Sequence, residues 1–140
     1  MYRFVILLAF VPLSWGQAKA RPNEDAASVR AKWEQVYNSG NADKFAALST
    51  KDAMLLGSTA PLFTGTDGVK AYVSKHPAGI KTKMGDQHAI AAGPDVPLSS
   101  GFADFTFPNG RVAPFRITVA IVKVDGKWLI AQHHGSPVPK

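Results

Sequence analysis

The stretch that decides the fold is residues 115–139, FRITVAIVKVDGKWLIAQHHGSPVP. Asp125 and Gly126 at its centre form a strong two-residue hairpin signal, because both central positions of such a turn require a positive φ. A tight turn at this point pairs Val124 with Lys127. The stretch therefore predicts two antiparallel strands that end the chain.

Side chains alternate along a strand, so the predicted hairpin has two different faces. In the predicted register Thr118 lies opposite His133, and these two residues share a face with Arg116 that we expect to line a ligand pocket. A bulge in either strand would change this assignment. The other face is almost wholly apolar and comprises Ile117, Val119, Ile121, Trp128, Ile130 and His134. We expect it to be exposed and to pair two copies as a homodimer, because a large exposed apolar patch usually marks an interface.

The rest of the chain is predicted to begin with helices and to continue with strands. Apolar residues recur every three or four positions between Asn23 and Asn38, which is typical of an amphipathic helix. Trp33 and Tyr37 lie on this apolar stripe, where they either pack in the core or form the wall of a ligand pocket. The further predicted elements are a helix at 42–48, a strand at 53–56, a helix at 66–73 and strands at 80–92 and 98–107. This order predicts an α+β fold with the helices on one face of a curved antiparallel sheet.

Residues 1–20 are predicted to be a secretory signal peptide. Arg3 precedes an apolar stretch that is shorter than the roughly 20 residues needed to span a bilayer, and Ala18-Lys19-Ala20 matches an A-x-A cleavage site. The alternatives are an uncleaved anchor or a buried strand. We expect residues 21–140 to form one mature soluble domain, secreted or periplasmic and not membrane-bound.

Charge and composition argue against several classes of partner. The formal net charge is +6 at pH 7, but the cations are scattered singly, whereas a nucleic-acid interface needs clustered Lys and Arg with aromatics. The chain has no cysteine, so it has neither disulfides nor thiolate metal sites. His133 and His134 are adjacent and therefore point to opposite faces of a strand, where they cannot share one ion. We expect no nucleic-acid partner, no metal and no cofactor, since nucleotide and flavin fingerprints are also missing.

The remaining chemistry is that of acid, base and hydrogen bond. Arg116 and His133 are predicted to hold an anionic or carbonyl oxygen, and His133 to carry a proton because its usual pKa of about 6.5 lies near neutral pH. Asp52 or Asp104 is predicted to act as a base or to fix the imidazole tautomer. Alternatively, Arg116 pairs with an aspartate at the end of the sheet and His133 is a hydrogen-bonded core residue. The sequence leaves open whether His88 or His76 reaches the pocket.

The final stretch also carries a family resemblance. Its pattern R-x-T-x-x-x-V-x-x-D-G-x-W-x-I-x-x-H-H-x-S-x-x-P resembles the end of SnoaL-like, SgcJ/EcaC-type proteins of the nuclear transport factor two-like superfamily, which also contains the calcium/calmodulin-dependent kinase association domain. The segments 52–57 and 69–72, with Gly65 between them, resemble the middle of the same family, and the likeness covers residues 26–139. Gly135 departs from the pattern, because the family's usual H-H-S-S has its first serine there. The resemblance implies a cone-like fold in which a strongly curved sheet wraps round the first helix and leaves an apolar pocket open at one end.

Two classes of function follow from these expectations. The favoured one is a secreted module that binds a small apolar or anionic ligand through Arg116, Trp33, Tyr37 and Thr118 and pairs through its sheet. The resemblance implies the other: a cofactor-independent isomerase, cyclase or dehydratase acting on a small apolar carbonyl compound through His133 and an aspartate, or an SgcJ/EcaC-type oxidoreductase.

Overall fold

The computed structural model describes residues 22–59 and 61–139, so the predicted signal peptide at 1–20 lies outside the described residues. The first elements are α1 (Pro22–Asn38), α2 (Ala42–Ala46), β1 (Ser49–Leu56), β2 (Leu62–Thr64) and α3 (Gly65–Val73). Four longer strands follow: β3 (Lys81–Gly93), β4 (Val96–Thr106), β5 (Val112–Val124) and β6 (Lys127–Pro137). The predicted α+β class is confirmed, although the sequence did not reveal β2.

The six strands form one sheet in the order β2-β1-β6-β5-β4-β3. The strands from β3 to β6 are antiparallel neighbours joined by short turns. β1 runs parallel to β6, so the sheet is mixed and the prediction of an antiparallel sheet is wrong for this pair. A parallel pairing is possible because a helix and four strands separate β1 from β6, whereas a short turn joins only antiparallel strands.

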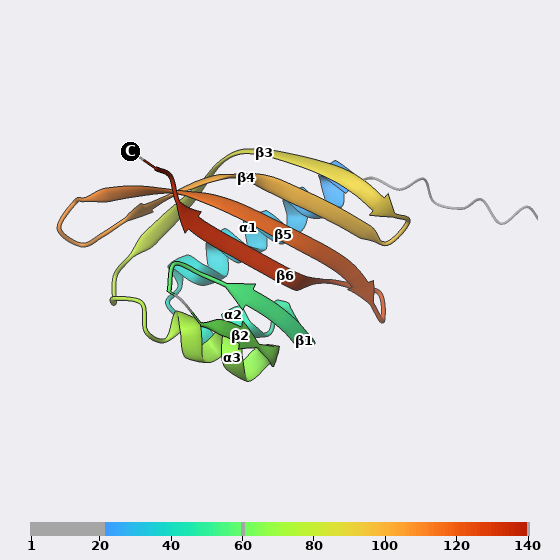
Figure 1. Ribbon diagram of the computed structural model, residues 1–140, viewed down its shortest axis with the longest axis horizontal. Helices are drawn as coiled ribbons and strands as arrows, with labels where there is room; N and C mark the ends of the chain where they lie inside the picture. Colours follow the sequence, from blue (N-terminus) through green and yellow to red (C-terminus); the bar gives the residue numbers. More distant parts are fainter. Residues whose placement is uncertain (1–21, 60, 140) are drawn as a thin grey trace, which may run out of the picture.

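Helix α1 lies behind the long strands in Figure 1, whereas α2 and α3 lie beside β1 and β2. The side chains that α1 buries are Ala26, Val29, Trp33 and Tyr37, which recur every three or four residues as predicted. They pack against buried residues of the sheet such as Ala103, Phe105 and Ile121. The expectation that helices cover one face of the sheet is thus confirmed.

The hairpin between β5 and β6 follows the predicted register only near its turn. Asp125 and Gly126 have φ values of 49° and 76°, and pairing proceeds as predicted as far as Ile121 with Ile130. Ala120 then pairs with Gln132, which leaves Ala131 as an extra residue in β6. This bulge shifts the register by one, and a shift of one residue turns every later side chain to the other face.

The shift changes the partner of His133. His133 lies opposite Val119, not Thr118, so the predicted common face of His133, Arg116 and Thr118 is wrong. His133 instead shares a face with Val119 and Ile117, and all three side chains are buried. Arg116 and Thr118 lie on the opposite, exposed face of the sheet.

The apolar face of the hairpin is part of the core. Val119, Ile121 and Ile130 are 4% exposed or less, so the prediction that this face is exposed is wrong. Trp128 is half-buried and packs against the same core, with the Lys123 amine 5.2 Å from the centre of its ring. Val119, Ile121 and Ile130 are therefore not available for a dimer contact in the folded chain.

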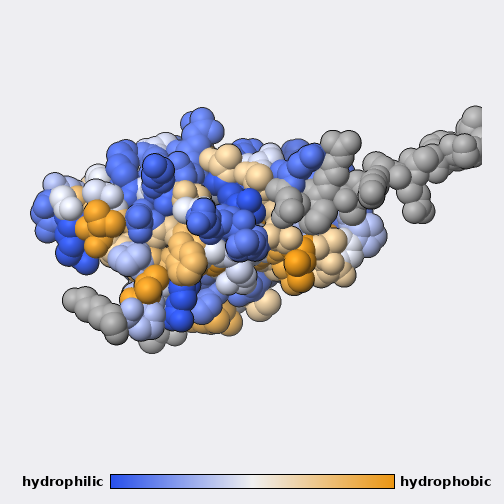
Figure 2. Space-filling model, turned by 90° about the horizontal axis from the view of Figure 1, so that it is seen from above, coloured by the Kyte–Doolittle hydropathy of each residue, from blue (hydrophilic) through white to orange (hydrophobic). Residues whose placement is uncertain are grey.

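The surface seen in Figure 2 is mostly hydrophilic, with hydrophobic residues in small separate groups. None of the helices in the described ranges has the length and apolar character needed to cross a bilayer.

Candidate functional site

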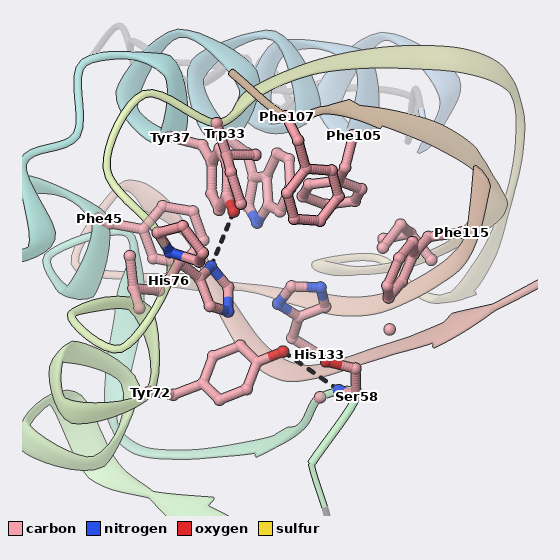
Figure 3. A pocket seen from close by; sticks show the side chains of 16 residues that line it. Trp33, Tyr37, Phe45, Ser58, Tyr72, His76, Phe105, Phe107, Phe115 and His133 are labelled. Atoms are coloured by element: carbon pink, nitrogen blue, oxygen red, sulfur yellow. Dashed lines mark hydrogen bonds between the residues drawn. The ribbon is translucent and has the colours of Figure 1, made fainter. Parts of the chain in front are cut away.

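An aromatic cavity of about 160 Å³ lies between α1, the end of α3 and the inner face of the sheet (Figure 3). Its wall includes seven aromatic rings, from Trp33, Tyr37, Phe45, Tyr72, Phe105, Phe107 and Phe115, and its other lining residues include Ile117, His76 and His133. No Asp, Glu, Lys or Arg occurs among the described residues of this lining. The cavity therefore offers a ligand aromatic surface and a few neutral polar groups.

Trp33 and Tyr37 pack in the core and also form part of the cavity wall. The two roles that were predicted as alternatives therefore occur together. Their rings stack at 5.2 Å with an angle of 9° between the planes. Trp33 also meets Phe45 and Phe105 edge to face, at 5.4 and 6.3 Å. Such contacts hold large rings in fixed orientations, so we expect the wall to keep its shape without a ligand.

His133 reaches the cavity because of the bulge at Ala131. Its side chain is 9% exposed, and its ring meets Trp33 edge to face at 5.7 Å. Burial, with smaller effects from the nearby His134 and His76, lowers the pKa of His133 to about 4, so the imidazole is neutral at pH 7. Its Nε2 atom is buried and has no hydrogen-bond partner within residues 22–59 and 61–139. Two roles were predicted for His133: a core histidine that makes a hydrogen bond, and an imidazole that carries a proton near neutral pH. Its environment agrees with neither role.

His76, which follows α3, is the site residue that the sequence did not assign. Its Nδ1 lies 2.7 Å from the hydroxyl oxygen of Tyr37, and its ring meets Tyr72 edge to face at 4.6 Å. Burial lowers the pKa of His76 and raises the pKa of Tyr37, so both groups are neutral at pH 7. The turn that follows α3 brings this imidazole inward. The one sign of this in the sequence is the His76-Pro77 dipeptide at the end of that turn. His88, in contrast, is exposed on β3.

Tyr72 forms the cavity wall next to the end of β1. The backbone N–H of Ser58 donates a hydrogen bond to the Tyr72 hydroxyl over 3.1 Å. A Cβ atom on the adjacent Gly57 would lie 2.1 Å from the Tyr72 ring and hydroxyl. Glycine at position 57 is therefore what lets the tyrosine lie against the strand.

The other predicted site residues lie outside the cavity. Arg116 is exposed, and its guanidinium donates one long hydrogen bond of 3.4 Å to the carbonyl oxygen of Pro137. Thr118 is exposed and accepts a hydrogen bond from Ser100 on the same outer face. Arg116 and Thr118 thus do not join His133, because the bulge separates their faces.

The two predicted carboxylates are also remote from the imidazoles. Asp52 is exposed on β1, and Asp104 is exposed on β4 opposite Pro114 of β5. Neither residue is part of the cavity lining, and neither makes a hydrogen bond to His133. The structure therefore brings together Trp33, Tyr37 and His133 of the predicted residues, and adds His76 and Tyr72.

Known structures of this architecture come from several bacteria. A proposed calcium/calmodulin dependent protein kinase II association domain from Xanthomonas campestris has 26% sequence identity and a TM-score of 0.72, over 82% of this chain and 86% of that one. A proposed dehydratase of the nuclear transport factor two-like family from Streptomyces avermitilis has 15% identity and a TM-score of 0.72, over 85% and 97%. A ketosteroid isomerase-like protein from Erwinia carotovora atroseptica has 15% identity and a TM-score of 0.69, over 84% and 96%. At such low identity the last two likenesses show the fold alone.

A search of the curated proteins found no similar sequence. The sequence profile of the SnoaL-like domain, in contrast, matches residues 27–140, which is most of the chain. The structural neighbours agree with the resemblance drawn from the final hairpin. The chain therefore belongs to the SnoaL-like domain family, within the nuclear transport factor two-like fold.

Proposed function

We propose that this protein binds a small, neutral and mainly apolar molecule in the aromatic cavity. The observation that supports the proposal is the lining, which combines seven aromatic rings with neutral imidazoles and contains no charged side chain among the described residues. A charged ligand would lose its hydration there without gaining a counter-charge. We therefore favour a neutral ligand over the anionic one that Arg116 suggested.

The size of the cavity limits the ligand. Its volume of about 160 Å³ lies below the roughly 300–1,000 Å³ of drug-sized sites. It is close to the engineered apolar cavity of about 150 Å³ that holds benzene. We therefore expect a compound with one or two small rings to fit without rearrangement of the wall.

An enzyme acting on such a compound is the second candidate. Two imidazoles and two tyrosine hydroxyls line the cavity, and the structural neighbours include a proposed dehydratase and a ketosteroid isomerase-like protein. However, a base with a pKa of about 4 is a weak proton acceptor at pH 7, and the aspartates predicted to assist His133 lie elsewhere. We therefore favour binding, with His76 as the proton carrier if turnover occurs.

A thermal-shift screen of the purified protein tests the proposal. The panel contains neutral aromatic hydrocarbons and ketones, steroids and aromatic carboxylates, each near a hundred times a plausible Kd. A ligand at that excess stabilises the folded chain by about 2.7 kcal/mol, which raises Tm by several degrees. Each stabilising compound is then incubated with the protein, and chromatography shows whether it is converted or only held.

A pair of tryptophan variants controls the screen. Val73→Trp fills the cavity from α3 and should abolish the stabilisation, whereas the same substitution at the exposed Val112 should not. The proposal fails if no neutral compound stabilises the protein, or if Val73→Trp leaves the stabilisation unchanged while Tm of the unliganded protein stays high.

We also propose that residues 1–20 direct the protein out of the cytoplasm, and that the mature chain is a homodimer. The dimer would use the outer face of the sheet, where Ile90 and Phe102 are 65% and 53% exposed. Light scattering should give twice the mass of the chain, and Phe102→Glu should halve it. N-terminal sequencing of protein from the native host should begin near residue 21, and a start at Met1 would contradict the signal peptide.

A further inference from the structure

Two imidazoles from distant parts of the chain meet at the aromatic cavity. His76 follows α3, His133 lies on β6, and Figure 3 shows their rings turned towards each other between Tyr37 and Tyr72. Their proximity is also felt electrostatically, since a charge on His76 would disfavour protonation of His133. No charged side chain occurs in the described lining around them, so none competes with a ligand for the N–H groups and lone pairs of the two imidazoles.

The contact with Tyr37 selects one tautomer of His76. The Tyr37 hydroxyl has no acceptor among the described residues other than Nδ1 of His76, 2.7 Å away. If Nδ1 carried the proton, the hydroxyl hydrogen would be left without a partner in a buried site. This favours the tautomer in which the hydroxyl donates to Nδ1 and the ring proton of neutral His76 lies on Nε2. Tyr37 thus makes His76 an N–H donor.

His133 is a histidine without hydrogen bonds to the described part of the chain. Neither of its ring nitrogens has such a partner, although the side chain is nine-tenths buried. A buried polar group that lacks a partner costs roughly 1–3 kcal/mol, and a ligand that supplies the partner recovers this cost. Nε2 has almost no exposed surface, so the ring nitrogen that a ligand can reach is Nδ1, which in a neutral imidazole is either an N–H donor or a lone-pair acceptor.

We propose that His76 and His133 together recognise the oxygen of a neutral carbonyl compound whose rings lie on the aromatic wall. This inference rests on the proposed function and names the chemistry of its ligand. A carbonyl oxygen has two lone pairs and accepts the Nε2–H of His76 and an N–H of His133 at once. A hydrocarbon leaves both imidazoles unpaired, and a carboxylate brings an uncompensated charge into the cavity.

A comparison of two compounds of nearly equal shape distinguishes recognition of a carbonyl oxygen from simple apolar binding. Indane is a hydrocarbon, and 1-indanone adds one ketone oxygen to the same rings. The quantity to measure is the ratio of their dissociation constants, Kd(indane) divided by Kd(1-indanone), by isothermal titration of the wild type and of His133→Leu. The matched control is His134→Leu, because His134 is the neighbouring residue on the exposed face.

We expect His133→Leu to lower this ratio about five- to tenfold, the effect of losing one buried hydrogen bond, with little change in the Kd of indane. His134→Leu should leave the ratio unchanged. An equal ratio in wild type and His133→Leu would overturn the inference and leave apolar binding intact. If neither compound binds, both the inference and the proposed function fail.

A spectroscopic measurement keeps the inference testable if His133→Leu does not fold. Imidazole ¹⁵N spectra of the wild type should show His76 protonated on Nε2, and Tyr37→Phe should redistribute that proton between the nitrogens. Addition of 1-indanone should shift the Nε2 signal of His76 and the signals of His133, whereas indane should not shift them. Identical spectra with the two compounds would overturn the assignment, as would a His76 proton on Nδ1.

Discussion

Substituting Gly57 by alanine tests how the cavity wall is held. The new Cβ would lie 2.1 Å from Cζ and from the hydroxyl oxygen of Tyr72, a separation that non-bonded atoms do not adopt. The φ of Gly57 is not positive, so an alanine backbone fits and the cost comes from the tyrosine. Tyr72 is 8% exposed and lines the cavity, so its ring can relieve the clash only by leaving its packing against the strand and moving into the cavity.

The magnitude follows from three contributions. Moving a packed ring costs about 1–3 kcal/mol, as overpacking does in other cores. Loss of the hydrogen bond from the Ser58 N–H to the Tyr72 hydroxyl costs about 0.5–1.5 kcal/mol. Alanine returns about 0.4–1 kcal/mol because it restricts the unfolded chain. We therefore expect Gly57→Ala to lower the free energy of unfolding by about 0.5–4 kcal/mol.

Urea denaturation followed by circular dichroism measures this loss, and a double-mutant cycle with Tyr72→Leu assigns its cause. In the Tyr72→Leu background the tyrosine ring and hydroxyl are gone, so Gly57→Ala should cost less than about 0.5 kcal/mol or should stabilise. An equal loss in both backgrounds would refute the reasoning, because the strain would then not lie against Tyr72.

Three further predictions concern the hairpin and its histidine. Arg116→Ala should leave ligand affinity unchanged and alter stability by no more than about 0.5 kcal/mol, because the side chain lies on the exposed face; a loss of affinity in titration would contradict this placement. Between pH 6.5 and 4 the unfolded chain binds a proton at His133 that the folded chain does not, so stability should fall by about 3 kcal/mol as pH drops through this range. His133→Leu should remove this part of the pH dependence, and an unchanged slope in urea titrations would count against the buried, neutral imidazole. Deleting Ala131 should lower the free energy of unfolding by about 3 kcal/mol or more, because it would turn His133 outward and His134 into the core; near wild-type stability would show that the bulge is dispensable.

Local signals were sufficient for most of the fold. The three- and four-residue spacing on α1 identified its buried stripe, and the Asp-Gly dipeptide placed the turn after β5. The parallel pairing of β1 with β6 has no such signal, because it depends on contacts between segments far apart in the sequence. The short strand β2 is equally defined by its partner β1 and not by its own residues.

The site could be predicted only in part, because a single extra residue in β6 decides which side chains line the cavity. Ala131 is an ordinary small residue in an apolar run, and nothing in its neighbours marks it as unpaired. Its insertion moves His133 from the face of Arg116 to the face of Val119, which replaces a charged pocket by a neutral aromatic one. His76 was unassignable for a related reason, since its contact with Tyr37 joins residues 39 positions apart.

The charge preference of the cavity tests the central claim most directly. Isothermal titration at pH 7 compares 1-indanone with indane-1-carboxylate, which adds an anionic group to rings of the same size. The account predicts saturable binding of the ketone, with one molecule per chain, and no binding of the carboxylate at a hundredfold higher concentration. Tighter binding of the carboxylate would contradict the account, because it would require a cation at the site that the lining does not contain.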